Sequence, residues 1–328
     1  MLIAPPPGHA NRKMTASSHI PVQMRLAIGQ RSGIVHNHLY SGRLASTTND
    51  SRLMIIVRDI AALRAALAEL PRPRALVATM GALHAGHMAL VAEAQRLAPD
   101  GVVASIFVNP LQFGPNEDFT RYPRLEAEDL AMLRAAGCNV AWLPPVEAMY
   151  PPGIATRITV AGPAEGFEGA VRPGHFEGVA TVVTKLLNQT APDAALFGEK
   201  DWQQVMVVTR LAADLDIPTR IVPVPTVRDP DGLALSSRNR HLTAAERTLA
   251  PLVHAVLCET AVRLRDGQPV VEAERQGADT LRASGFVPDY LSLVDAATLR
   301  PLKALQQPAR ILVAARLGGV RLLDNIAV

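Results

Sequence analysis

The chain has 328 residues, of which 48% are hydrophobic, yet no apolar run approaches the length of a membrane span. This length is sufficient for two domains and a substantial hydrophobic core. The two cysteines, Cys138 and Cys258, are far apart and lack CxxC spacing, which argues against a disulfide scaffold. We therefore expect a protein of a reducing compartment, the cytoplasm, that is not inserted in a membrane.

The basic pI of about 9.1 comes from the first 53 residues. That segment holds six basic residues and one acid, and subtracting these from 33 and 30 leaves 27 and 29. Residues 54–328 therefore carry a net charge of −2, and aromatic residues make up only 4% of the chain. A body with no basic excess and few aromatics does not predict a nucleic-acid-binding surface.

Residues 1–53 differ from the rest in composition. They are rich in Pro, Ser, Thr, Asn and Gly and show no sustained apolar period, so we expect a largely disordered extension. Their basic, nearly acid-free composition superficially resembles an organelle transit peptide, but the apolar segment of a secretory signal is missing. A misassigned upstream start is an equally good explanation, because a regular pattern begins at Met54.

From residue 54, apolar runs alternate with helical patterns. Strands are expected at residues 54–57, 74–79, 102–108, 139–143, 157–160, 193–197 and 219–224. Helices are expected after the capping residue Asp59, after residue 87, and at 125–137, 178–189 and 201–215. This alternation predicts an α/β fold with a Rossmann-like, mainly parallel sheet and helices on both faces. Without a GxGxxG motif it gives no indication of NAD.

The pattern changes after residue 229. Helices are expected at 244–264 and 270–283, and strands at 290–294, 310–315 and 320–324, the last two joined in a hairpin by Leu317, Gly318 and Gly319. The predicted domains are therefore 54–229, Rossmann-like, and 230–328, a smaller α+β domain.

The stretch TMGALHAGH, residues 79–87, follows an apolar strand and precedes a helical pattern. A strand, a glycine turn and a helix start direct unpaired N–H groups and a positive helix end at an anion, commonly a phosphate. His84 and His87, three residues apart, project to the same side. Each histidine taken alone is more often a cap, and the pair lacks an obvious third metal ligand. Together the features predict a phosphoryl site with two imidazoles and no protein metal site.

Three polar loops that contain glycine follow expected strands: 80–87, 109–114 and 198–201. A fourth polar loop, 235–239, lies at the junction of the two predicted domains. Ligands of parallel sheets bind beyond the carboxyl ends of the strands, so these loops predict one shared crevice. Lys200 supplies a compact ammonium for phosphate, while Ser236, Ser237 and Arg238 offer hydroxyls and a guanidinium. Gln112 and Gln204 suit a small polar acid.

Two further segments contain possible site residues. Arg172, in RPGHFEG, is a candidate for contact with an anion, whereas His175 in the same segment suits a structural brace. Tyr122, in RYPR, suits packing better than ligand contact.

Seven blocks in order carry a specific resemblance: TMGALHAGH, SIFVNPLQFG, RYPR, RPGHFEGVATVV, FGEKDWQQ, DGLALSSRN and LLDN. Together they resemble the pantoate–β-alanine ligase family of the HxGH nucleotidylyl-transferase superfamily. The resemblance runs from Met54 nearly to the end and does not cover residues 1–53. One departure is Ala78, where the family usually has proline before TMG, which removes a backbone stiffener but no reacting group.

The resemblance implies a two-step ligation. The pantoate carboxylate attacks the α-phosphate of ATP to give pantoyl adenylate and pyrophosphate, and the β-alanine amine then displaces AMP to form pantothenate. It also suggests a homodimer. The chemistry of adenylation adds Mg²⁺ bridging the phosphates. Because the SSR loop lies at the domain junction, we expect the C-terminal domain to act as a lid that closes over ATP. Two alternatives stay open: another HxGH nucleotidylyl transferase, which keeps the nucleotide on its product, and a non-catalytic nucleotide-binding module.

The resemblance also implies roles by position. His87 is the implied proton donor, with His84 and Lys200 as the other catalytic residues. The implied ATP contacts are Met80, Gly81, Ala82, Leu83, His84, Ala85, Gly86, His87, Gly198, Glu199, Lys200, Asp201, Val227, Leu235, Ser236, Ser237 and Arg238. The implied contacts of pantoate or β-alanine are Gln112, Gln204, Asn109, Tyr122 and Arg172.

Overall fold

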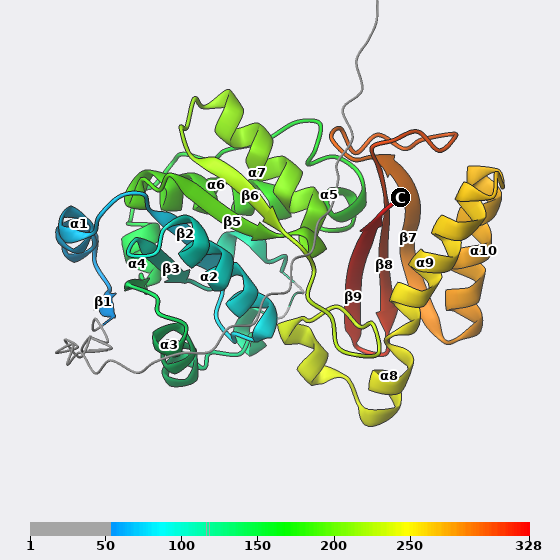
Figure 1. The fold of residues 1–328 in the computed structure, drawn as a ribbon, viewed down its shortest axis with the longest axis horizontal. Coiled ribbons are helices and arrows are strands. Elements are labelled where there is room, and N and C mark those ends of the chain that lie inside the picture. The colour runs from blue at the N-terminus through cyan, green and yellow to red at the C-terminus, as the bar shows by residue number, and fades with distance from the viewer. Residues whose placement is uncertain (1–53, 116, 118) are drawn as a thin grey trace, which may run out of the picture. The chain divides into compact units, whose positions relative to one another are not determined.

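The computed structural model describes residues 54–328 except 116 and 118, so the expected extension at 1–53 lies outside the described residues. The described residues fall within one compact unit and contain a six-stranded parallel sheet and a three-stranded antiparallel sheet (Figure 1). This confirms the expected α/β fold class. The division into domains at residue 229 stays a prediction.

The strands of the parallel sheet are buried and apolar, as expected for a sheet covered on both faces. Their order across the sheet is β1 (Ile55–Val57), β4 (Val140–Trp142), β3 (Val102–Ile106), β2 (Ala75–Thr79), β5 (Ala194–Gly198) and β6 (Arg220–Val224). Alternate residues point to opposite cores: Leu76 and Val103 lie in one apolar cluster, and Ala75, Val77 and Val102 lie in the other.

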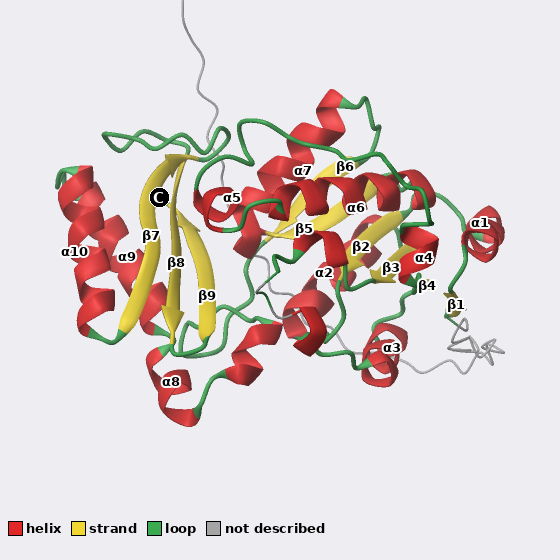
Figure 2. Ribbon diagram, turned by 180° about the vertical axis from the view of Figure 1, so that it is seen from behind, coloured by secondary structure: helices red, strands yellow, loops and turns green. Residues whose placement is uncertain are grey.

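Helices cover both faces of this sheet (Figure 2). The first core holds residues of α1 (Ile60–Glu69), α4 (Val146–Met149), α6 (His175–Thr190) and α7 (Trp202–Asp214). The second core holds residues of α2 (Ala85–Leu97) and α3 (Glu126–Ala135). The expected cap of α1 is confirmed, because the Asp59 side chain accepts a hydrogen bond from the Ala62 N–H at 2.8 Å.

The course of the chain through the sheet determines where a ligand can bind. From the central strand β2 the chain continues to β3 and β4 on one side, and later returns to β5 and β6 on the other side. Because β2 leads into α2 on one face and β5 leads into α7 on the opposite face, the loops after these neighbouring strands diverge. Their divergence creates the crevice in which open α/β sheets bind ligands.

The antiparallel sheet consists of β7 (Phe286–Asp295), β8 (Ala309–Leu317) and β9 (Val320–Ala327). Helices α9 (Leu252–Arg265) and α10 (Val270–Ala283) share its apolar core. Leu312 of β8 and Tyr290 of β7 pack in another small cluster with Trp202 of α7 and Phe167 of α5 (Phe167–Val171), which joins this sheet to the parallel-sheet region. The expected glycine hairpin between β8 and β9 is confirmed, with Gly318 at a φ of +53°.

Three expectations were wrong in detail. The expected strand at 157–160 lies outside any strand, and its Ile158 N–H donates to the Thr181 hydroxyl of α6 instead of to a neighbouring strand. The expected helix at 244–264 is interrupted near Pro251 into α8 (Ala244–Leu249) and α9. The strand expected at 290–294 begins at Phe286, because a register shift after Pro288 lets the ladder continue past the proline.

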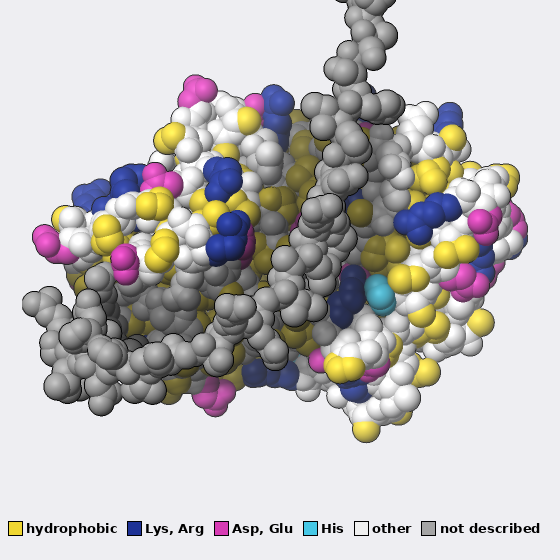
Figure 3. Space-filling model, viewed as in Figure 1, with side chains coloured by type: hydrophobic (Ala, Val, Ile, Leu, Met, Phe, Trp, Pro, Cys, Tyr) yellow, Lys and Arg dark blue, Asp and Glu magenta, His cyan; other side chains and the backbone are white. Residues whose placement is uncertain are grey.

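Two surface properties bear on partners. Among residues 54–328, as far as they are described, no helix has the length and apolar character needed to cross a membrane. On the face shown in Figure 3, basic and acidic side chains are interspersed.

Candidate active site

A cavity of about 230 Å³ lies at the carboxyl ends of β2, β3 and β5. The four loops expected to share a crevice all contribute to its lining. Of the expected site residues, those that line it are Met80, His84, Gly86, His87, Asn109, Gln112, Tyr122, Gly198, Lys200, Asp201, Gln204, Val227, Leu235, Ser236, Ser237 and Arg238.

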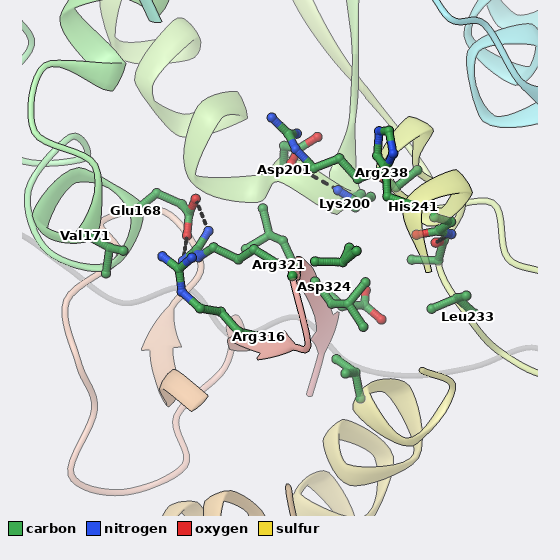
Figure 4. Close-up of a pocket in the computed structure, with 18 of the residues that line it drawn as sticks. Glu168, Val171, Lys200, Asp201, Leu233, Arg238, His241, Arg316, Arg321 and Asp324 are labelled. Carbon is green, nitrogen blue, oxygen red and sulfur yellow. Dashed lines mark hydrogen bonds and ion pairs between the residues drawn. The ribbon is translucent and has the colours of Figure 1, made fainter. Parts of the chain in front are cut away.

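A second cavity of about 460 Å³ adjoins the first and shares Lys200, Asp201, Ser236 and Arg238 with it. Strand β9 contributes to its wall, and Figure 4 shows Lys200, Asp201 and Arg238 opposite Arg321 and Asp324 of that strand. The cationic side chains therefore lie where the two cavities meet.

The turn after β2 is built around a buried carboxylate that was not predicted from the sequence. Gly81 and Ala82 have φ values of +82° and +51°, and a Cβ on Gly81 would lie 2.9 Å from Asp129 Oδ2. The N–H groups of Ala82 and Leu83 donate to the Asp129 carboxylate at 2.9 and 2.7 Å. The expectation that this turn presents unpaired amides to an anion is therefore wrong for these two residues.

The two histidines cap the start of α2. His84 Nδ1 accepts from the Gly86 N–H at 3.1 Å, and His87 Nδ1 accepts from the His84 N–H at 3.3 Å. The ring centroids are 4.1 Å apart, so the prediction that both rings project to one side is confirmed. Since each Nδ1 accepts a hydrogen bond, the proton of each neutral ring is on Nε2, where it is available as a donor.

The surroundings keep both rings neutral. Burial, with Lys200 and Arg240 nearby, lowers the pKa of His84 to about 4. Burial and the neighbouring His84 lower the pKa of His87 to about 3. At neutral pH the site therefore contains imidazole hydrogen-bond donors, and an imidazolium acid at His87 is disfavoured.

The 3₁₀ turn η3 (Glu199–Asp201) after β5 presents its side chains in different directions. Lys200 Nζ lies 3.4 Å from Asp201 Oδ1 (Figure 4), and both residues line the two cavities. The Glu199 carboxylate accepts from Arg310 of β8 at 2.8 Å. Glu199 thus contacts the antiparallel sheet and is not among the residues that line either cavity.

The SSR loop is held from two sides. Ser236 caps the 3₁₀ helix η4 (Ser237–His241) by accepting from the Arg238 N–H at 3.3 Å. The Ser237 and Tyr122 hydroxyls lie 3.2 Å apart, and Arg238 Cζ is 5.9 Å from the Tyr122 ring centroid. The buried Tyr122 therefore orients the loop through its ring and hydroxyl.

A hydrogen-bonded chain orients Gln112. The Tyr150 hydroxyl donates to Asn109 Oδ1 at 2.7 Å, Asn109 Nδ2 donates to Gln112 Oε1 at 3.0 Å, and Gln112 Nε2 lies 3.0 Å from Met80 Sδ. Asn109 is 1% exposed, so its role in this geometry is to hold Gln112. The side-chain amide of Gln204, in contrast, makes no hydrogen bond to another described residue and lines the cavity.

Arg172 is already paired. Its guanidinium donates to Glu117 at 2.6 Å and to the Gln112 carbonyl at 3.3 Å, and it lies 3.1 Å from His175 Nε2. Arg172 lines the larger cavity. Its present partner is therefore a carboxylate of this chain. Its bond to the Gln112 carbonyl also supports the turn that carries Gln112, and His175 Nδ1 lies 2.9 Å from the same carbonyl oxygen.

Six expected residues are not among those lining the 230 Å³ cavity: Gly81, Ala82, Leu83, Ala85, Glu199 and Arg172. Asp129, conversely, was not among the predicted site residues. The signal that could have identified it is its position beside Leu130 on the buried stripe of the helix. A carboxylate on an apolar stripe needs a buried partner.

The chain is similar to known proteins over most of its length. The family described as pantoate–beta-alanine ligase matches residues 55–327. A pantothenate synthetase of Acidiphilium cryptum is 60% identical over 273 residues, which cover 83% of this chain and 98% of that relative. A crystal structure of pantothenate synthetase from Thermus thermophilus has a TM-score of 0.79 at 49% identity, covering 83% of this chain and 99% of that one. A pantoate–beta-alanine ligase of Francisella tularensis, described as complexed with beta-gamma ATP and beta-alanine, has a TM-score of 0.71 at 35% identity and covers 84% and 98%.

Replacing the buried carboxylate should loosen the turn after β2. In Asp129→Ala the Ala82 and Leu83 amides lose their acceptor, so we expect a loss of about 1–3 kcal/mol in the free energy of unfolding. Hydrogen exchange at these two amides should become faster. Glu128→Ala, on the exposed side of the same helix, should change stability by less than about 0.5 kcal/mol. Unchanged exchange at both amides in Asp129→Ala would contradict this assignment.

The neutral histidines should make stability depend on pH. The folded-state pKa values of His84 and His87, about 4 and about 3, lie below the ordinary 6.5, so between these values the unfolded chain binds more protons. The stabilisation is complete above pH 6.5 and is lost as the pH falls through the two folded-state pKa values, about 4 for His84 and about 3 for His87. We expect the double variant His84→Gln, His87→Gln to show a smaller slope of unfolding free energy against pH in this window, measured by urea titration. His241→Gln, at an exposed position, is the control.

Proposed function

The chain belongs to the pantoate–β-alanine ligase family, and from this membership we propose how its residues divide the work of the reaction. The enzyme is an ATP-dependent ligase that condenses pantoate with β-alanine to pantothenate through pantoyl adenylate, releasing AMP and pyrophosphate. The observation that supports our assignment is a single cavity containing Lys200, Arg238 and two neutral imidazoles beside the Gln112 and Gln204 amides.

In the first step the pantoate carboxylate attacks the α-phosphate of ATP, and negative charge grows on the phosphate and on the departing pyrophosphate. Donors fixed before the reaction stabilise such charge at the least cost of reorganisation. We assign this task to the Lys200 ammonium and the Nε2–H groups of His84 and His87, together with Arg238 and the serines of its loop. Because the Ala82 and Leu83 amides are occupied by Asp129, side chains carry more of this task than at a helix terminus with free amides.

The acid substrate needs polar groups that orient it without neutralising its reacting carboxylate. Gln204 has a side-chain amide without a hydrogen bond to another described residue, and Gln112 has one oriented by Asn109. Amides bind hydroxyl and carboxyl oxygens as neutral partners. We assign pantoate to these two amides, which leaves its carboxylate nucleophilic towards ATP.

We also propose that Mg²⁺ accompanies ATP. Within residues 54–328, apart from the two left undescribed, no group of three His, Cys, Asp or Glu side chains is arranged to hold a metal ion. Such a donor set fits Mg²⁺ that enters on the phosphates, and the half-exposed Asp201 carboxylate, which lines both cavities, is the acidic candidate beside it. When bound, the ion would neutralise phosphate charge. The residues' own task is to hold the phosphates with Lys200 and Arg238.

We further propose that the enzyme acts in the cytoplasm as a homodimer, with residues 230–328 closing over residues 54–229. The use of ATP supports the compartment, as do Cys138 and Cys258, which are both free thiols. The larger cavity between β9 and the Lys200 loop is space that closure would reduce. Light scattering tests the dimer, and a decrease in the radius of gyration with ATP tests closure.

The function is tested by measuring AMP and pyrophosphate release by the full chain from Mg-ATP and pantoate, with and without β-alanine. We expect AMP only when pantoate and β-alanine are both present, with one AMP released for each pantothenate formed. A product that retained the nucleotide would indicate another HxGH transferase. Binding of ATP without any consumption would indicate a non-catalytic module.

Single substitutions should separate the proposed roles. Lys200→Ala and His87→Asn, which retains an acceptor near Nδ1 but lacks the Nε2 donor, should each slow pyrophosphate release by about 10²–10³-fold. His87→Gln, whose amide donor extends towards the Nε2 position, should be less impaired. Lys303→Ala, an exposed lysine, is the matched control.

Pyrophosphate release at the wild-type rate by folded Lys200→Ala or His87→Asn would overturn the corresponding role. Since the His87 pKa is about 3, the rate should also show no inflection from this ring near pH 6.5.

A further inference from the structure

The last strand of the antiparallel sheet contacts the backbone of the loop that carries Lys200. Asn325 of β9 is 3% exposed, and its Nδ2 donates to the Glu199 carbonyl at 2.8 Å and to the Lys200 carbonyl at 2.9 Å. One side-chain amide thus bonds two successive peptide groups from residues more than 120 positions away in the chain. Asn325 belongs to the LLDN block, for which the catalytic assignment gives no role.

A buried arginine fixes the orientation of that amide. Arg310 of β8 donates to Asn325 Oδ1 at 2.6 Å and to the Glu199 carboxylate at 2.8 Å, and its Cζ lies 3.6 Å from the Trp202 ring centroid. With its oxygen bonded by a guanidinium, Asn325 can direct only its N–H groups at the two carbonyls. Arg310 therefore contacts both ends of η3: it bonds Glu199, the first residue of η3, and stacks on Trp202, the first residue of α7.

The adjacent residue makes a parallel connection to a second active-site segment. The Asp324 carboxylate accepts from Arg228 at 2.6 and 2.9 Å and from the Asn325 N–H at 2.8 Å. Arg228 directly follows Val227, which lines the 230 Å³ cavity. The end of β9 is therefore held in place independently of the Lys200 loop, which lets it serve as a fixed support.

We propose that Asn325 is a positioning residue for Lys200: it holds the η3 backbone so that the ammonium meets the reacting phosphate. The proposal rests on the role assigned above to Lys200. The proposal assigns Asn325 no contact with the reacting groups, so that it acts through the two carbonyls. A displacement of about 1 Å in a catalytic group costs on the order of 10²-fold in rate, so loss of this support should be measurable.

The primary variant is Asn325→Asp, which keeps the shape and the acceptor for Arg310 but replaces the N–H donors with an oxygen facing two carbonyls. We expect pyrophosphate release to slow by about 10- to 100-fold, with the KM for ATP changed less than about threefold. Asn325→Ala, which removes the donors without adding a charge, is the second variant and should show the same split between kcat and KM.

A double-mutant cycle with Lys200→Ala provides the decisive measurement. If Asn325 acts through Lys200, adding Asn325→Ala to Lys200→Ala should slow the reaction by less than about twofold further. A general loss of structure would instead multiply the two effects. Glu274→Ala is the matched control. Glu274 accepts a hydrogen bond from the Leu293 N–H at 2.7 Å in the same antiparallel region, and this bond does not involve η3. It should lower the Tm without lowering kcat.

The outcomes are distinguishable. Wild-type kcat in folded Asn325→Asp and Asn325→Ala, multiplicative effects in the cycle, or an equal loss of kcat in Glu274→Ala would each overturn the inference. If Lys200→Ala itself kept the wild-type rate, the role of Lys200 would fail instead. Should Asn325→Asp not fold, the cycle with Asn325→Ala gives the same decision.

Discussion

The β2 and β5 strands lie side by side and run in the same direction, but the chain leaves them towards opposite faces of the sheet. Helix α2 packs on one face and α7 on the other, so the loops that follow the two strands diverge. The histidines at the start of α2 and Lys200 in η3, just before α7, then line one cavity from two sides. The apolar strands and the two cores that pack against them maintain this geometry, so the candidate site residues are held by packing far from the cavity.

The site uses this position differently from a site that binds phosphate through helix amides. Asp129 satisfies the amides of the turn, and the two imidazoles satisfy further amides at the start of α2. These bonds make the turn rigid and leave two neutral Nε2 donors directed at the cavity. Positive charge comes from Lys200 and Arg238, on other loops. A neutral turn held by hydrogen bonds, with charged side chains on separate loops, suits a reaction in which negative charge grows on the α-phosphate and pyrophosphate then leaves.

The sequence predicted the fold class and the order of most elements, because buried parallel strands and amphipathic helices have distinct periodicities. It also predicted that the loops carrying His84, Gln112, Lys200 and Ser236 would meet, because this follows from the parallel sheet. The contacts of Asp129 were not predictable in the same way, since a carboxylate in the first turn of a helix has a sufficient local explanation. Pro251 is a local signal for a helix break, but the apolar pattern on both sides of it predicted one continuous helix.

Residues that connect distant segments were the least visible in the sequence. Glu199, an expected ATP contact, pairs with Arg310, and Arg172 pairs with Glu117. Neither pair was predicted, because each partner comes from another part of the chain. Periodicity and motif spacing describe neighbours in sequence and say nothing of such pairs. Asn109 and Tyr122 line the cavity, where each hydrogen-bonds to another residue of the site, and their expected contacts with substrate stay predictions. The roles of the catalytic side chains stay predictions.

The stacking of Arg310 on Trp202 also has an optical consequence. The chain contains two tryptophans, and the other, Trp142, is fully buried within the parallel-sheet core. Trp202 lies at the junction of both sheets, with its indole N–H bonded to the Ala296 carbonyl and its ring beneath a guanidinium. Indole emission depends on nearby charge and polarity, so this side chain is a built-in spectroscopic reporter. Movement of β8 relative to α7 would change its emission while Trp142 supplied a constant background.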